Sequence, residues 1–271
     1  MKQDTMRYVL GASDQEIERL DRQSASIEPA TRLLLRTAGI APGMRVLDLG
    51  TGVGHVATLI ADLVGPEGRV IGIDSNVRLL EVATGRASTR SQLRFVEGDV
   101  RSWRDPEAFD AIVGRLILFH LADPVSVLRH HAASLRPGGM VLALDFDLGA
   151  CRTEPALPLA TEALGWVDSA FRSAGANPII GARLALLLAE AGLAEVQGFG
   201  IQGYLAPGHP AGPALLAGVV RTLAPQIVAT GAATAEQIDI DTFEARLAAA
   251  MQASESVLLP PTLAAAWGRC R

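Results

Sequence analysis

Residues 45–54 read Arg-Val-Leu-Asp-Leu-Gly-Thr-Gly-Val-Gly, and this stretch decides the fold. Its first half is a short apolar run, which is typical of a buried parallel strand. Three glycines at alternate positions then end the strand, and residues 55–63 place apolar side chains on one face of a helix. The pattern predicts a strand, a glycine loop and a helix. Glycines let the loop turn through positive φ, and the start of the helix offers N–H groups to a ligand.

The glycine spacing limits which ligand the loop can bind. A dinucleotide fingerprint that starts at Gly50 would need its third glycine at position 55, which is His55. The phosphate-binding loop of nucleotide hydrolases would end in Gly-Lys-Ser/Thr, and the sequence lacks that ending here. The loop therefore suits a ligand without a pyrophosphate. A tight turn that binds nothing and an NAD-binding dehydrogenase are the alternatives at this point.

Acidic residues follow the next two predicted strands. The strand at residues 69–73 ends in Asp74, where a carboxylate can accept hydrogen bonds from both hydroxyls of a ribose. The alternative is that Asp74 caps the next helix, although either of the two residues after it could do so. The strand at residues 93–97 is followed by Asp99, which by itself is typical of a turn aspartate after a glycine. Its register with Asp74, which suits recognition of a ribose, favours a ligand-binding role for Asp99 as well.

Strands and helices alternate through residues 43–147, which predicts an α/β fold with a doubly wound, mostly parallel sheet. Within it, Asp-x-Gly-x-Gly-x-Gly at positions 48–54 and Leu-Arg-Pro-Gly-Gly at positions 135–139 resemble motifs of the class I S-adenosylmethionine-dependent methyltransferases, in the type 11, UbiE-like small-molecule subgroup. The resemblance implies a Rossmann-like sheet of seven strands with an antiparallel last strand. It also implies S-adenosyl-L-methionine as cofactor and methylation of a small molecule, for example in secondary metabolism.

The resemblance further implies a set of cofactor-binding residues. In that family the glycine loop wraps the methionine part of the cofactor. Asp74 would then bind the ribose, and Asp99 with the next backbone N–H would bind the adenine. The turn after the fourth strand (residues 109–113) would line the floor between cofactor and acceptor. The full set is Asp48, Gly50, Thr51, Gly52, Gly54, Asp74, Ser75, Asp99, Val100, Arg115, Tyr8 and Gln23.

Methyl transfer asks little chemistry of the protein, because the cofactor supplies the reactive group and the protein positions two substrates. The sequence has no Ser-His-Asp signature and no cluster with metal-ligand spacing, so no metal is expected. His120 follows the fourth strand and is the candidate general base if the acceptor is a hydroxyl. A structural role for His120 is the alternative. A cofactor-binding protein that no longer methylates is a second function that these residues allow.

Residues 1–43 precede the first predicted strand and are expected to form an N-terminal helical lid. The sequence predicts two helices there, at about 14–24 and about 28–39, with Ser13 and Glu16 as a capping box for the first. The stretch resembles the N-terminal signature of the same methyltransferase subgroup, in which it folds over the cofactor. Helices that merely pack on the core are the alternative.

Beyond the lid, residues 44–147 are expected to form the cofactor-binding half of the core, and residues 148–271 its remainder. Helical segments at about 150–178 and 210–253 would form a cap over the acceptor pocket, because specificity in such folds is built on insertions. A plain extension of the surface is the alternative. Residues 256–259 are predicted as the final short strand.

The composition bears on partners and setting. The 271 residues carry 24 basic and 29 acidic side chains, a net charge of −5, which argues against a nucleic-acid-binding surface. No apolar run reads as a membrane span and the N-terminus does not read as a signal peptide, so no membrane partner is expected. Two cysteines make no disulfide framework. A cytoplasmic protein with a small-molecule substrate is therefore expected, and a homodimer is left open.

Overall fold

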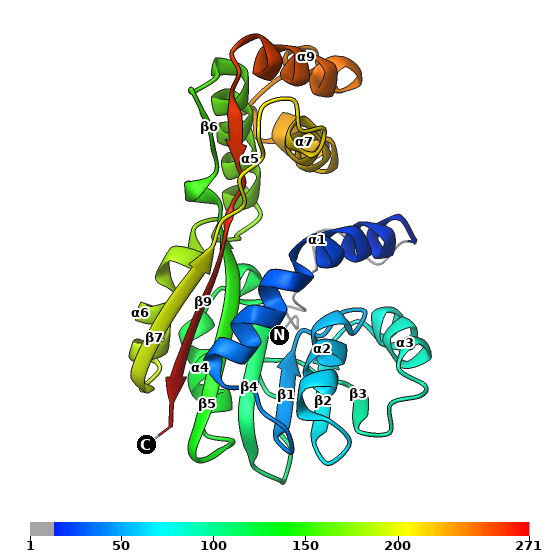
Figure 1. The fold of residues 1–271 in the computed structure, drawn as a ribbon, viewed down its shortest axis with the longest axis vertical. Helices are drawn as coiled ribbons and strands as arrows, with labels where there is room; N and C mark the ends of the chain where they lie inside the picture. The colour runs from blue at the N-terminus through cyan, green and yellow to red at the C-terminus, as the bar shows by residue number, and fades with distance from the viewer. Residues whose placement is uncertain (1–13, 271) are drawn as a thin grey trace, which may run out of the picture. The chain divides into compact units, whose positions relative to one another are not determined.

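The computed structural model describes residues 14–270 of the chain, and these divide into two compact units (Figure 1). The first unit contains the chain up to Asp145, then Arg183–Phe199, and then the segment from Ala264 onwards. The second unit contains Phe146–Ala182 and Gly200–Leu263. The chain therefore leaves the first unit twice and returns twice.

The first unit is built on a seven-stranded sheet with the strand order β3-β2-β1-β4-β5-β9-β7. The four pairs from β3 to β5 are parallel, as expected for a doubly wound sheet. The order reverses between β1 and β4, so the carboxyl ends of these two neighbours mark a topological switch point, where ligands bind in open α/β sheets. The strands are β1 (Arg45–Leu49), β2 (Arg69–Asp74), β3 (Leu93–Glu97), β4 (Phe109–Arg115), β5 (Leu135–Asp147), β7 (Ala194–Ile201) and β9 (Thr262–Arg269).

The strand β9 corrects the prediction for the end of the chain. Residues 256–259 were expected to be the final strand, but Val257–Leu259 forms β8, which pairs with β6 (Arg152–Glu154) in a separate two-stranded sheet. Instead, β9 joins the main sheet between β5 and β7 and runs antiparallel to both (Figure 1). Its end pairs with the start of β5, since Cys270 N–H donates to the Gly139 carbonyl at 2.8 Å. The sequence did not predict β9 because it contains three consecutive alanines, and alanine is depleted in strands.

The helix α1 (Asp14–Ala38) corrects the prediction of two N-terminal helices, because it runs unbroken through Pro29. Proline has no N–H to donate and normally ends a helix. Here hydroxyl groups on both sides of the proline bind backbone carbonyls: Ser26 donates to Gln23 at 2.7 Å and Thr31 donates to Ile27 at 2.8 Å. The helix also packs on α2, and this burial offsets the cost of the proline.

Four more α-helices belong to the described part of the first unit. The glycine loop leads into α2, which packs on β1 and β2, while α3 packs on β2 and β3 and α4 packs on α6. The core between these layers is aliphatic, as the low aromatic content requires. The helices are α2 (His55–Val64), α3 (Val77–Arg86), α4 (Pro124–Ala132) and α6 (Leu184–Glu190).

The second unit is mostly helical and has its own hydrophobic core. In it α7 packs against both α5 and α9, around the fully buried side chains of Phe243 and Val220. Helical structure in the two segments at about 150–178 and 210–253 is as predicted. The helices are α5 (Pro158–Ser173), α7 (Ala211–Ala229), α8 (Ala235–Ile238) and α9 (Ile240–Ala253).

Among the described residues, α7 alone is long and apolar enough to cross a membrane by length and composition. This is weak support for a span, because the core helix of a soluble protein meets the same criteria. The side chains of Leu216, Val220, Leu223 and Ile227 are buried against the rest of the second unit, so α7 reads as a core helix of that unit.

Candidate functional site

The glycine loop between β1 and α2 needs glycine for its backbone. Gly50, Gly52 and Gly54 all have φ in the left-handed region, at 64°, 54° and 83°. A Cβ on Gly50 would also lie 2.7 Å from the Ile117 side chain, whereas a Cβ on Gly52 would meet nothing within 4 Å. The loop is therefore closed on the Gly50 side, and its backbone is open to a ligand at Gly52.

Asp74 ends β2 and its carboxylate faces this loop. One oxygen accepts from the Gly52 N–H at 2.8 Å and the other accepts from the Asn76 N–H at 2.9 Å. Burial raises the pKa of Asp74, while the N–H groups of Asn76, Gly52 and Ser75 oppose that rise. The cap of α3 is Asn76, whose side chain accepts from Leu79 N–H, so capping does not explain Asp74. A carboxylate offers about four acceptor positions, and two stay available for ligand hydroxyls after these two bonds.

Asp48 and Thr51 bring unsatisfied polar atoms to the same loop. Within residues 14–270, Asp48 Oδ2 and Thr51 Oγ1 are buried side-chain atoms that reach no hydrogen-bond partner at bonding geometry. Burial raises the pKa of Asp48 to about 7, and the nearby Thr51 hydroxyl and Arg115 guanidinium oppose that rise. Leaving a buried polar atom unpaired costs about 1–3 kcal/mol, so such atoms need an explanation in a native fold. A polar ligand on the glycine loop would provide it.

Arg115 ends β4 and supplies a buried positive charge beside Asp48. Burial lowers the pKa of Arg115 to about 10, while the charges of Asp48 and Glu28 oppose that change. Its guanidinium donates to the Thr31 hydroxyl and to the Ser24 hydroxyl of α1, each at 3.0 Å. Helix α1 therefore orients the arginine that the sequence placed in the site.

Asp99 and Val100 lie in the turn after β3, as predicted. Arg101 binds the Asp99 carboxylate through its backbone N–H at 2.8 Å and through its guanidinium at 2.6 Å. These bonds hold the pKa of Asp99 below its usual range, so Asp99 is ionised at neutral pH and can only accept hydrogen bonds. Gly98 N–H donates to the Asp74 carbonyl at 2.9 Å, which ties this turn to the end of β2.

Of the site residues predicted near the N-terminus, Gln23 lies within the described part of the chain. Tyr8, and Ser13 of the predicted capping box, lie outside the described residues. Gln23 lies on α1 and accepts from Arg19 at 3.2 Å, and Arg19 also makes a two-point ion pair with the buried Glu16. The structure thus places Gln23 in a polar cluster on α1.

His120 ends a short 3₁₀ turn (Leu118–His120) beyond β4. Burial lowers the pKa of His120 to about 4, and the charge of Arg19 lowers it further, so the imidazole is neutral at physiological pH. Its ring packs edge-on against Phe119 at 5.0 Å between centroids. The Phe119 N–H donates to the buried Asp145 at 3.2 Å, which anchors the turn on the end of β5. A neutral imidazole can accept a proton, but a pKa near 4 makes it a weak base.

Four residues of this site were not predicted from the sequence. Ser24 and Thr31 bind Arg115, His131 binds the Val100 carbonyl at 2.7 Å, and Asp145 binds the turn that carries His120. Each contact joins residues that are between 26 and 91 positions apart, so local patterns carry no sign of it. The one sign in the sequence was Asp145, an acidic residue within the apolar strand at residues 140–146, because acidic side chains are seldom buried without a partner.

Comparison with known proteins relates the chain to methyltransferases. A family model described as a methyltransferase domain matches residues 40–172. The ubiquinone/menaquinone biosynthesis C-methyltransferase UbiE of Ectopseudomonas mendocina is 31% identical over 120 residues, which cover 43% of this chain and 47% of that protein. An uncharacterized 37.1 kDa protein in transposon TN4556 of Streptomyces fradiae is 32% identical over 165 residues, which cover 60% and 47% of the two chains. The chain therefore spans about half the length of these curated relatives.

Solved structures share the fold. The YcgJ protein from Bacillus subtilis superposes with a TM-score of 0.58 at 20% identity, covering 90% of this chain and 99% of that one. The phosphoethanolamine N-methyltransferase 2 of Haemonchus contortus superposes with a TM-score of 0.55 at 15% identity, covering 90% and 52%. The sheet order, the glycine loop and the match to the family model all indicate the same kind of domain. The chain therefore carries a class I S-adenosylmethionine-dependent methyltransferase domain.

Proposed function

We propose that the protein transfers a methyl group from S-adenosyl-L-methionine to a small-molecule acceptor. The observation that carries this proposal is the glycine loop, whose backbone is open at Gly52 and which has the buried carboxylate of Asp48, the carboxylate of Asp74 and the guanidinium of Arg115 around it. These groups need a ligand that is polar and carries both a positive and a negative charge. A nucleoside joined to an amino acid has that character.

The donor and acceptor groups of the loop fit the parts of this cofactor. Asp74 has acceptor positions left for two ribose hydroxyls, and Asp99 accepts from an amino group on the base. Arg115 can pair with an amino-acid carboxylate, and Asp48 can pair with an ammonium group, which would keep Asp48 ionised. When bound, S-adenosylmethionine supplies an activated methyl group on a positively charged sulfur.

The protein's own task is then to position and to exclude water. Ser24 and Thr31 of α1 hold Arg115, and this supports the role of residues 14–38 as a lid over the cofactor. His120 can accept a proton from a hydroxyl acceptor in its neutral form, with the small driving force that a pKa of about 4 allows. An acceptor that loses no proton would not need His120.

A small acceptor is supported by charge and by the relatives. The net charge of −5 does not favour a polynucleotide. The UbiE relatives are named for a C-methylation in quinone biosynthesis, and the nematode structure is named for an N-methylation of phosphoethanolamine. The methyltransferase family model matches residues 40–172 and so includes only part of the helical second unit. This supports a role for the second unit as the cap that selects the acceptor, in secondary metabolism or elsewhere.

Two measurements test the proposal in sequence. Calorimetric titration with S-adenosylhomocysteine should show binding, whereas NAD should show none. Incubation with S-adenosylmethionine and a small-molecule library should then give an acceptor whose mass increases by one methyl group. Binding without any methylated product would favour the cofactor-binding protein that does not methylate. Binding of NAD in place of S-adenosylhomocysteine would overturn the proposal.

A further inference from the structure

The turn at residues 98–103 is held in place by several hydrogen bonds and by side-chain packing. Its own backbone closes it, since Ser102 and Trp103 both donate their N–H groups to the Asp99 carbonyl, at 3.0 and 2.8 Å. A Cβ on Gly98 would lie 2.5 Å from the Trp103 ring, so the indole lies directly on this glycine. The turn can therefore keep one conformation, which recognition of a base by a backbone N–H requires.

Two consecutive histidines of α4 hold the same turn from outside. His131, which is 1% exposed, lies with Nε2 2.7 Å from the Val100 carbonyl, and His130 Nε2 lies 3.0 Å from the Trp103 carbonyl. A carbonyl only accepts, so both imidazoles donate from Nε2. The Nδ1 of His130 lies 3.2 Å from the Arg104 guanidinium and accepts from it, which is consistent with the Nε2–H group donating to the turn.

The Val100 carbonyl and the Val100 N–H belong to one residue, and in the proposed function that N–H binds the adenine ring. A buried hydrogen bond on the carbonyl holds the peptide unit that follows Val100, and together with a second anchor on Val100 it also restrains the N–H of the preceding peptide unit. Val100 itself is buried in the hydrophobic core, so its side chain gives the turn a second anchor.

From this geometry we infer that His131 is a positioning residue for recognition of the cofactor's base. It would act through Val100, without touching the cofactor, and set the height at which Asp99 meets the 6-amino group. The inference rests on the proposed function. It predicts that His131 controls which base is bound, beyond any effect on stability.

The test measures base selectivity, which a merely structural residue would not change. The dissociation constants of S-adenosylhomocysteine and of its 6-oxo analogue, S-inosylhomocysteine, are compared by calorimetry. The wild-type protein should prefer the 6-amino compound, because ionised Asp99 can only accept. His131→Leu removes the donor and should reduce this preference by about tenfold, equivalent to about 1.4 kcal/mol. His131→Gln, whose amide can donate, should restore part of it.

A matched control separates positioning from stability. Leu128→Ala removes a buried side chain from the same helix, α4, without a bond to the turn, so it should lower the melting temperature and keep the preference. If His131→Leu does not fold, His131→Asn serves, since its shorter side chain does not reach the Val100 carbonyl. An unchanged preference in the folded variant, or an equal loss in Leu128→Ala, would overturn the inference. So would a wild-type protein that binds both compounds equally, whereas binding of neither would instead refute the proposed function.

Discussion

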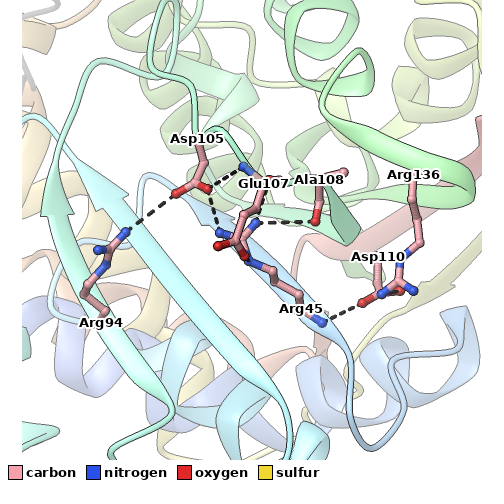
Figure 2. Close-up of polar contacts among 7 residues, drawn as sticks. All are labelled: Arg45, Arg94, Asp105, Glu107, Ala108, Asp110 and Arg136. Carbon is pink, nitrogen blue, oxygen red and sulfur yellow. Dashed lines mark hydrogen bonds and ion pairs between the residues drawn. The ribbon is translucent and has the colours of Figure 1, made fainter.

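The two edges of the parallel strands in the first unit are built in opposite ways. At the carboxyl edge, the glycine loop gathers Asp48, Thr51, Asp74 and Arg115, and burial raises the pKa values of both carboxyl groups. At the amino edge, Figure 2 shows arginines and carboxylates that are joined to one another. One edge is left ready for a ligand, and the other edge holds the strands together.

The amino edge is centred on Arg45, the first residue of β1. Its guanidinium donates to Asp105 and to the Glu107 carbonyl, each at 2.7 Å (Figure 2). The guanidinium also lies 4.2 Å from the centre of the Phe109 ring. The Arg45 backbone N–H donates to Asp110, which also pairs with Arg136 at the start of β5. These contacts link the beginnings of three strands, so their charges serve stability.

The comparison teaches that charge and burial alone do not identify a functional site. Asp105 at the amino edge and Asp74 at the carboxyl edge are both shielded carboxylates. Burial would raise the pKa of Asp105, but the Glu107 N–H and the two arginines Arg45 and Arg94 outweigh it and hold this pKa below the usual range. Among the described residues, Asp74 bonds to backbone N–H groups alone, and burial raises its pKa. What distinguishes Asp74 from Asp105 is the missing countercharge.

The largest expected effect is on cofactor binding at the carboxyl edge. Asp74→Ala should weaken binding of S-adenosylhomocysteine by about 2–4 kcal/mol, because charge-assisted hydrogen bonds to the ribose are lost. Calorimetry measures this, and circular dichroism should show an intact fold. Asp62→Ala, which removes an exposed carboxylate that pairs with Arg32 and Arg90, is the control and should bind normally. Wild-type affinity in Asp74→Ala would leave Asp74 only the role of holding Gly52.

The next effect concerns stability at the amino edge. Arg45→Ala should lower the free energy of unfolding by about 1–3 kcal/mol. Asp105 loses the arginine that binds it at 2.7 Å, and Phe109 at the start of β4 loses a cation–π contact. Urea denaturation measures this. Arg94→Ala, with a side chain 64% exposed, should cost less than about 0.5 kcal/mol. Cofactor affinity should stay unchanged in both variants, and a loss of affinity in Arg45→Ala would contradict the division between the edges.

A third prediction is that removing the ionisable group of Asp48 stabilises the ligand-free protein. Burial raises the pKa of Asp48 to about 7, well above its value in an unfolded chain. The contribution of Asp48 to stability is therefore full below its unfolded pKa of 3.8, falls as the pH rises to about 7, and is lost above that value, since only the folded chain resists ionisation. Asp48→Asn cannot ionise, so at about pH 8 it should stabilise the ligand-free protein by about 1–2 kcal/mol. Thermal unfolding across pH checks this, and a destabilised variant at that pH would count against it.

The smallest effect is an expected absence of pH dependence. The pKa of His120 is about 4, so its neutral form already dominates at physiological pH and increases further only as the pH rises through about 4. Single-turnover rates should show no histidine inflection between about pH 6 and pH 8. His120→Asn supplies the comparison. An inflection near pH 6.5 that is lost in this variant would show that the bound cofactor and acceptor restore an ordinary pKa.

The sequence predicted the parts of the fold that rest on local pattern. The glycine loop, the strand that ends in Asp74 and the parallel half of the sheet were all readable, because each depends on a few neighbouring residues. It did not predict the continuity of α1 through Pro29 or the strand β9, where packing overrides propensity. The contacts of Arg115 with Ser24 and Thr31 depend on folding, since they join β4 to a helix 84 to 91 residues away. The roles of the predicted site residues stay predictions until a ligand is measured.

The position of β9 also sets an order of events during synthesis. The sheet order β5-β9-β7 means that β7 touches the sheet only through β9, although β9 is made later in the chain. Until residues 262–269 have left the ribosome, β5 is an open edge and β7 has no neighbour to pair with. The glycine loop and its five-stranded sheet can fold first, since domains fold from the N-terminus as they are made. The nascent protein therefore exposes the unpaired edges of β5 and β7 during the translation of residues 202–261. Unpaired strand edges promote aggregation, so the risk of aggregation is high in this interval.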